Sequence, residues 1–167
     1  MKKITILFVL ALSFGLAAQS FAQGPGRAPA PALMDLATAK ALVDAATAEA
    51  KANNASVAIA VVDANGDLVN FNRMDGASAQ AVTSSQGKAR AAILFGLPTK
   101  AAADAVAAGT PLSATLTPSG AGAFPVTVQQ GGLPIIKDGK VIGGIGIGGA
   151  ASASDEMFAQ KALDSLK

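Results

Sequence analysis

Apolar residues recur along this chain with two different spacings, and each spacing predicts one kind of element. Recurrence every three to four residues, which is the period of an α-helix, predicts helices in several segments. These segments cover residues 35–53, 78–95, 99–107 and 154–166. Asp35, Thr99 and Ser154 are of the types preferred at the start of a helix, so we expect each of them to cap its helix.

Short runs dense in β-branched residues predict the strands. Residues 56–63 and 68–73 are two such runs, and the polar turn between them predicts a hairpin. A second hairpin is expected within residues 131–149, where Asp138-Gly139 can adopt the left-handed angles of a tight turn. The pattern leaves open whether a further short strand covers residues 126–129. Hairpins imply an antiparallel sheet, so the predicted fold class is α+β, with helices packed against that sheet.

The last apolar run of the second hairpin alternates isoleucine with glycine, up to residue 149. Because successive residues of a strand point to opposite faces, one face carries branched side chains and the other carries almost nothing. A strand face without side chains lets another backbone, a subunit or a flat ligand come unusually close. We therefore expect this face and its neighbouring loop to form a pocket shared between copies of the chain.

The N-terminal residues have the features of a secretion signal. Lys2 and Lys3 precede an apolar stretch over residues 4–18, and Ser20-Phe21-Ala22 places small residues at the cleavage positions, so we expect residues 1–22 to be removed. The apolar stretch is short for a membrane span and no later segment approaches one, so no span is expected after cleavage. The mature protein is expected to be periplasmic or secreted.

Two regions follow the signal. Residues 23–32 are rich in Pro, Gly and Ala, which is typical of a disordered linker. Residues 33–167 have the length of one ordinary domain. Its core must consist largely of Ala, Val, Ile and Leu, and Ala-rich helices bury little apolar area each. That composition favours association into a homo-oligomer.

Charge and missing residue types exclude several classes of function. Cleavage removes two of the thirteen basic residues and leaves eleven basic against eleven acidic, so nucleic-acid binding is not expected. The chain has no Cys and no His, which excludes disulfides, thiolate metal sites and imidazole chemistry. A hydrolase triad is excluded for the same reason. Tyr is absent too, so tyrosinate cannot serve as a haem ligand.

Five motifs in register resemble those of the GlcG/HbpS family of haem-binding proteins. In the order of the chain they are AIAVVDANG at residues 58–66, RMDGA at 73–77, KARAA at 88–92, FGLPT at 95–99, and the hairpin that runs from GGLP at 131–134 to GGIG at 143–146. The resemblance spans residues 36–166, which is nearly the whole mature domain. It implies a profilin-like α/β sandwich that assembles into higher oligomers, often octamers.

The same resemblance implies a ligand and partners. Relatives include a secreted haem-binding protein that partners a sensor kinase, and the C-terminal domain of PduO-type corrinoid adenosyltransferases. Haem degradation is associated with the family name. Some relatives hold the haem iron through a His, and this chain has none.

Four residues are candidates for contact with a bound haem. Thr99 lies near the position at which a Thr of the secreted relative is thought to contact the iron; the alternative is that it only caps the next helix. Met74 is the softest donor in a predicted loop, since Met34 and Met157 are placed in helices, although methionine more often fills gaps in a core. Arg73 and Lys88 are the other two.

Arg73 and Lys88 are candidates for pairing with a haem propionate or a substrate carboxylate. The alternative is a structural ion pair with Asp63 or Asp75. The acids in the first turn of the last predicted helix, Asp155 among them, are expected to serve the helix dipole.

Two functions follow from these observations. The preferred one is an exported homo-oligomer that binds haem or a similar tetrapyrrole at an apolar interface between copies, in support of haem degradation or haem sensing. The alternative is an accessory or sensory scaffold that binds a small metabolite or a partner protein and has no role with haem. The sequence leaves open whether any turnover occurs.

Overall fold

The computed structural model describes residues 34–114 and 125–166. The predicted signal peptide and linker lie outside these residues. The helices are α1 (Leu36–Ala52), α2 (Ala79–Phe95), α3 (Thr99–Ala107) and α4 (Ser152–Asp164). The strands are β1 (Ala58–Asp63), β2 (Leu68–Arg73), β3 (Gly132–Lys137) and β4 (Lys140–Gly148). None of the helices in the described part of the chain has the length and hydropathy needed to span a membrane.

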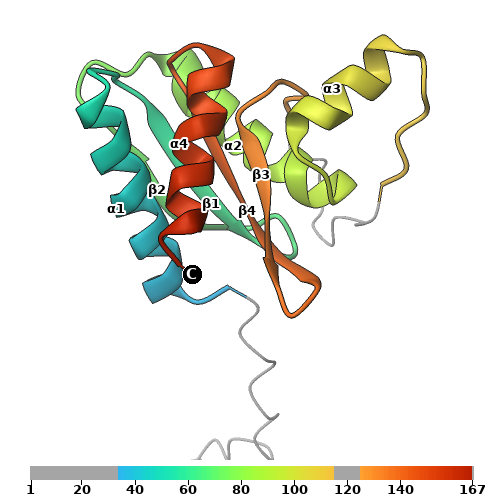
Figure 1. Ribbon diagram of the computed structural model, residues 1–167, viewed down its shortest axis with the longest axis horizontal. Helices are drawn as coiled ribbons and strands as arrows, with labels where there is room; N and C mark the ends of the chain where they lie inside the picture. Colours follow the sequence, from blue (N-terminus) through green and yellow to red (C-terminus); the bar gives the residue numbers. More distant parts are fainter. Residues whose placement is uncertain (1–33, 115–124, 167) are drawn as a thin grey trace, which may run out of the picture. The chain divides into compact units, whose positions relative to one another are not determined.

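One antiparallel sheet organises the domain, in the strand order β2-β1-β4-β3. Each predicted hairpin supplies two adjacent strands, and β1 joins the hairpins by pairing with β4. Helices α1 and α4 lie side by side on one face of the sheet, and α2 lies on the other (Figure 1). The α+β class and the antiparallel sheet predicted from the sequence are confirmed.

The main core lies between the sheet and the α1–α4 layer. Leu42 and Val43 of α1 and Phe158 of α4 pack there against Ile145 and Ile147 of β4, all of them buried. These are the residues whose helical or alternating spacing predicted the elements. The apolar face of each element therefore turns to the sheet, as its pattern indicates.

Most element boundaries are as the sequence predicts, and the exceptions have simple causes. Asp35 caps α1 through a hydrogen bond from the Thr38 N–H, and the turn at Asp138-Gly139 takes positive φ angles of 51° and 72°. One expectation is wrong: helix α4 begins at Ser152 instead of Ser154 and has no side-chain cap. Residues 126–129, for which the sequence left a strand open, form no strand.

The expectation for the glycine face of β4 is also wrong. A backbone does approach that face closely, but it is the backbone of the chain's own helix α2. A Cβ atom at Gly144 would lie 2.5 Å from the carbonyl oxygen of Ala89, and one at Gly146 would overlap the carbonyl oxygen of Ser85. This face is therefore filled within the protomer and is not available for a pocket shared between copies.

Candidate functional site

The four residues predicted to contact haem fall into two separate groups. Lys88 and Thr99 are buried and both lie against Gly132: a Cβ atom at that glycine would lie 2.5 Å from the Lys88 carbonyl oxygen and 2.7 Å from the Thr99 methyl group. Arg73 and Met74 line a different pocket, between α1 and β2. The structure does not bring the four together.

Thr99 binds the backbone of β3. It is fully buried at the first position of α3, and Pro98 takes the cap position without a side-chain hydrogen bond, so the prediction that Thr99 caps the helix is wrong. Its hydroxyl accepts a hydrogen bond from the Gly132 N–H at 2.8 Å and donates one to the Gly132 carbonyl at 3.2 Å. Thr99 therefore gives the edge strand β3 hydrogen-bond partners of the kind that a neighbouring strand would otherwise supply.

Replacing Thr99 by valine tests this role. Valine keeps the shape but leaves the N–H and the carbonyl of Gly132 without partners, so we expect a loss of about 1–3 kcal/mol in the free energy of unfolding. Urea titration followed by circular dichroism measures that loss. Thr99→Ser keeps the hydroxyl and is the matched control; a loss in Thr99→Ser without a loss in Thr99→Val would mean that the methyl group matters and the hydrogen bonds do not.

Lys88 is held in a buried ion pair. Its ammonium lies 2.8 Å from Asp155 Oδ2 and donates a second hydrogen bond, also 2.8 Å long, to the carbonyl of Ile147. The two side chains are 3% and 2% exposed. The sequence had suggested Asp63 or Asp75 as the partner of an ion pair, and the structure shows Asp155 instead. A contact of Lys88 with a haem propionate remains a prediction.

The carboxylate of Asp155 interacts mainly with Lys88, although the sequence predicted that it would interact with the helix dipole. Its other carboxylate oxygen accepts a hydrogen bond from the Ala150 N–H at 3.1 Å, which fixes the chain just before α4. Burial raises the pKa of Asp155 above its ordinary value, against the opposing effects of Lys88 and the Ala150 N–H. Asp155 therefore ties the start of α4 to the middle of α2.

Arg73 and Met74 line an open pocket with Thr47 and Lys51, here called the α1–β2 pocket, of about 320 Å³. Arg73 is exposed, and its guanidinium donates two hydrogen bonds, 3.0 and 2.7 Å long, to the carbonyl of Ala77. Met74 is half-buried and packs against the main core. The pocket has two cations and a thioether, but its other lining groups are mostly polar.

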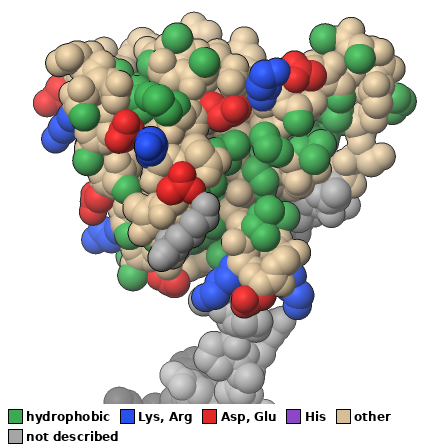
Figure 2. Space-filling view, in the orientation of Figure 1, with side chains coloured by type: hydrophobic (Ala, Val, Ile, Leu, Met, Phe, Trp, Pro, Cys, Tyr) green, Lys and Arg blue, Asp and Glu red, His purple; other side chains and the backbone are tan. Residues whose placement is uncertain are grey.

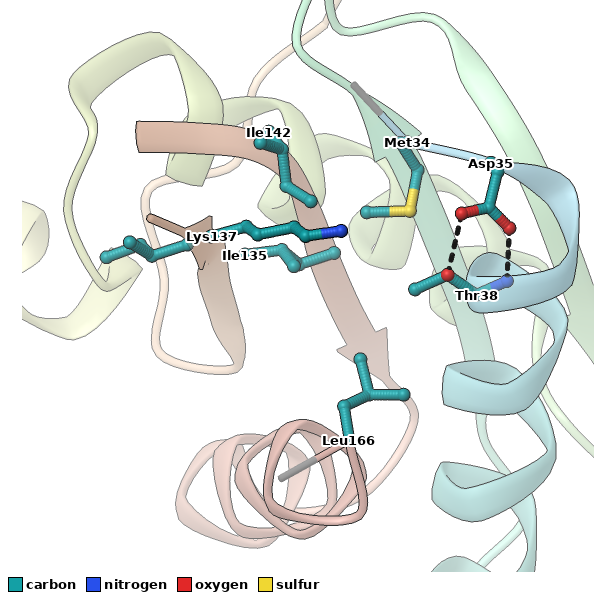
Figure 3. A pocket seen from close by; sticks show the side chains of 8 residues that line it. Met34, Asp35, Thr38, Ile135, Lys137, Ile142 and Leu166 are labelled. Atoms are coloured by element: carbon teal, nitrogen blue, oxygen red, sulfur yellow. Dashed lines mark hydrogen bonds between the residues drawn. The ribbon is translucent and has the colours of Figure 1, made fainter. Parts of the chain in front are cut away.

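A second pocket, here called the hairpin pocket, lies between the start of α1 and the β3–β4 hairpin. It has a volume of about 270 Å³. Met34 and Asp35 line it on one side, and Ile135, Lys137 and Ile142 line it on the other. Leu166, after α4, lies below them (Figure 3).

Met34 gives the hairpin pocket a sulfur atom. Its side chain extends from the start of α1 toward Ile142 and Lys137 (Figure 3). Asp35 beside it is held by two hydrogen bonds from Thr38, each 2.8 Å long, which lower the pKa of Asp35 and keep it ionised. Charged side chains gather at the tip of the hairpin, and hydrophobic ones lie along the strands above it (Figure 2).

The sequence reasoning missed Met34 because it placed that residue inside the first helix. In the structure α1 begins at Leu36, and Met34 precedes the cap residue Asp35. A signal for this was present, since the same pattern identified Asp35 as the cap. A residue before the cap lies outside the helix, so Met34 qualified as a donor on the same terms as Met74.

Haem requires apolar walls, a cation near its propionates and a donor to its iron. With no His, Cys or Tyr in the chain, the methionine thioether is the strongest remaining donor type. The α1–β2 pocket has the cations and a thioether but lacks apolar walls. The hairpin pocket has isoleucine walls, Lys137 and Met34 together, so its groups fit haem better than those of the α1–β2 pocket.

No group of three or more acidic side chains that could hold a metal ion occurs in residues 34–114 and 125–166.

Comparison with known proteins agrees with this fold and chemistry. The family of HbpS-like haem-degrading proteins matches residues 34–164. The protein GlcG of Escherichia coli K12 is 38% identical over 95 residues, which cover 57% of this chain and 66% of GlcG.

Two solved structures share the fold. The crystal structure of HbpS is 29% identical, with a TM-score of 0.69, over 80% of this chain and 90% of that one. A crystal structure of a PduOC:heme complex is 26% identical, also with a TM-score of 0.69, over 79% of this chain and 94% of that one. With the match over residues 34–164, they show that the chain belongs to the family of HbpS-like haem-degrading proteins.

Proposed function

We propose that this protein is exported, forms a homo-oligomer and binds haem, with the hairpin pocket as the site that receives the tetrapyrrole. The observation that carries the proposal is the meeting of Met34, Lys137 and isoleucine walls in one pocket. Membership of the haem-degrading family and the similarity to a protein crystallised with haem support it.

Each group of the pocket has a distinct task. The side chains of Ile135 and Ile142 would give a bound haem an apolar wall that excludes water. The ammonium of Lys137 would pair with a propionate, and the thioether of Met34 would be the donor to the iron. Bound haem supplies the redox chemistry of its iron, and the chain positions it.

The size of the hairpin pocket favours a site completed by a second copy. Its volume of about 270 Å³ falls below the usual range of roughly 300–1,000 Å³ for ligand pockets, so the pocket takes only part of a haem. Ile136 and Leu166 at its rim are 61% and 44% exposed. Covering these side chains with a second copy would bury apolar surface and enclose the rest of the ring.

The test uses the full chain, expressed in a host that can export it. We expect a mass that corresponds to cleavage after Ala22, sedimentation as an oligomer, and a saturable Soret shift when haem is added. Met34→Leu keeps the apolar volume but removes the donor, so we expect a changed Soret spectrum and an affinity lower by about tenfold or more. Lys137→Gln should weaken binding while the spectrum stays the same.

Matched variants in the α1–β2 pocket decide between the two sites. Met74→Leu and Arg73→Gln should leave haem binding as it is in the unaltered chain. If these variants weaken binding and Met34→Leu does not, the site belongs to the α1–β2 pocket, where two of the four predicted contact residues lie. Absence of any Soret shift in the unaltered chain would refute haem binding altogether.

A scaffold that binds a small metabolite is the second candidate. A separate cavity around Lys88 and Asp155 favours it, because that cavity is polar and has a volume of only about 240 Å³. A thermal-shift screen separates the two functions, since a ligand stabilises only the state that it binds. Stabilisation by small organic acids without any effect of haem would favour the scaffold. A partner protein, such as a sensor, stays a prediction.

A further inference from the structure

A polar cavity lies where the N-terminal ends of α2 and α4 approach the end of β4. It has a volume of about 240 Å³ and is here called the helix-end cavity. Ser78 and Ser84 line it from α2 and its cap, and Ser152 and Asp155 line it from α4. Gln80, Lys88 and Gln129 complete the polar lining, and the cavity has no apolar side chain larger than alanine.

Lys88 lines the cavity and has a hydrogen-bond donor that no described residue accepts. An ammonium group has three N–H bonds. Within the described residues Lys88 donates one to Asp155 and one to the carbonyl of Ile147, and the third has no acceptor. Because the side chain is only 3% exposed, an acceptor that enters the cavity would satisfy this donor.

Asp155 also lines the cavity, and its charge offsets that of Lys88. One of its oxygens is paired with Lys88 and the other accepts the Ala150 N–H, so both carboxylate oxygens are engaged. Helix α4, in contrast, has no side-chain cap at Ala151, and the first N–H groups of an uncapped helix lack partners. These groups and the helix dipole add partial positive charge at the same cavity.

We propose that the helix-end cavity binds a compact oxyanion, either the carboxylate of a small organic acid or inorganic phosphate. The Lys88 ammonium and the first N–H groups of α4 bind its oxygens, and the hydroxyl of Ser152 lies at the rim. The cavity is polar and lacks the apolar walls that a tetrapyrrole needs. The proposal therefore does not depend on haem binding at the hairpin pocket.

The test titrates inorganic phosphate, and separately acetate and lactate, into the full chain in a calorimeter. We expect saturable binding of at least one of them; phosphate alone would identify the phosphate class, and the organic acids alone the carboxylate class. Ser152→Asp places a negative charge at the rim and should weaken binding by about tenfold, since like charges a few ångströms apart repel strongly. It should not harm folding, because an acidic residue in the first turn of a helix is favourable.

Ser152→Asn is the matched neutral control and should bind within about twofold of the unaltered chain, because it introduces no charge. Backbone amide signals of residues 152–154 should move during the titration in an NMR spectrum. Equal binding by the Asp and Asn variants would place the anion elsewhere and overturn the proposal. Failure of all three anions to bind would overturn it as well, whatever the outcome with haem.

Discussion

Replacing Gly146 by valine is expected to prevent the protein from folding. Gly146 lies in the central strand β4, opposite Ala60 of β1 and Gly132 of β3, so it cannot shift sideways. Its missing side chain makes room for α2: a Cβ atom would overlap the Ser85 carbonyl oxygen and the Ala89 nitrogen. Both are backbone atoms in the middle of a helix and cannot turn aside.

The expected cost exceeds the usual penalty for an overpacked core, about 1–3 kcal/mol, because a whole helix must move away from the sheet. A domain with a total stability of about 5–15 kcal/mol does not tolerate such a loss. Circular dichroism and urea titration of Gly146→Val measure it.

Gly139→Asn, at the tip of the same hairpin, is the control for Gly146→Val. A Cβ atom there meets nothing within 4 Å, and asparagine tolerates the positive φ of 72°. A Gly146→Val protein that folds with ordinary stability would show that α2 does not pack on the glycine face as described.

Removing the charge of Lys88 has the second largest expected effect. Lys88→Met leaves Asp155 as an unpaired buried carboxylate, which costs about 3–5 kcal/mol when one partner of a buried pair is lost. The loss of the ion pair destabilises two elements at once, because the pair connects the middle of α2 with the first turn of α4. The midpoint of urea unfolding should fall sharply in this variant.

A double variant separates charge from packing. Lys88→Met combined with Asp155→Leu removes both charges and should recover much of the lost stability, since apolar replacement of a buried ion pair is often neutral or stabilising. Lys100→Met breaks the exposed pair with Asp104, in which both side chains are more than half exposed, and should change stability little. Equal effects of Lys88→Met and Lys100→Met would contradict the assigned burial.

The elements could be predicted because their signals are local. The cap at Asp35, the positive-φ turn at Asp138-Gly139 and the alternation of isoleucine with glycine in β4 each depend on a few neighbouring residues. The family could be predicted as well, because its motifs keep their order along the chain. The start of α4 was placed two residues late, because the helix has no capping side chain to mark it.

The partners of these elements could not be predicted in the same way. Lys88 and Asp155 are 67 positions apart, and Thr99 and Gly132 are 33 apart, so no spacing along the chain connects them. Of the four predicted site residues, only Arg73 and Met74 share a pocket. Met34 and Lys137 meet because the second hairpin folds back beside the start of α1.

The sequence by itself determined the helices and strands, the α+β class and the bare face of β4, because periodicity and turn chemistry act over a few residues. Only the tertiary structure decided what covers that face. A strand without side chains admits any close backbone, and here the chain carries its own helix α2 across the sheet onto that face. Which groups share a pocket was decided by the same packing.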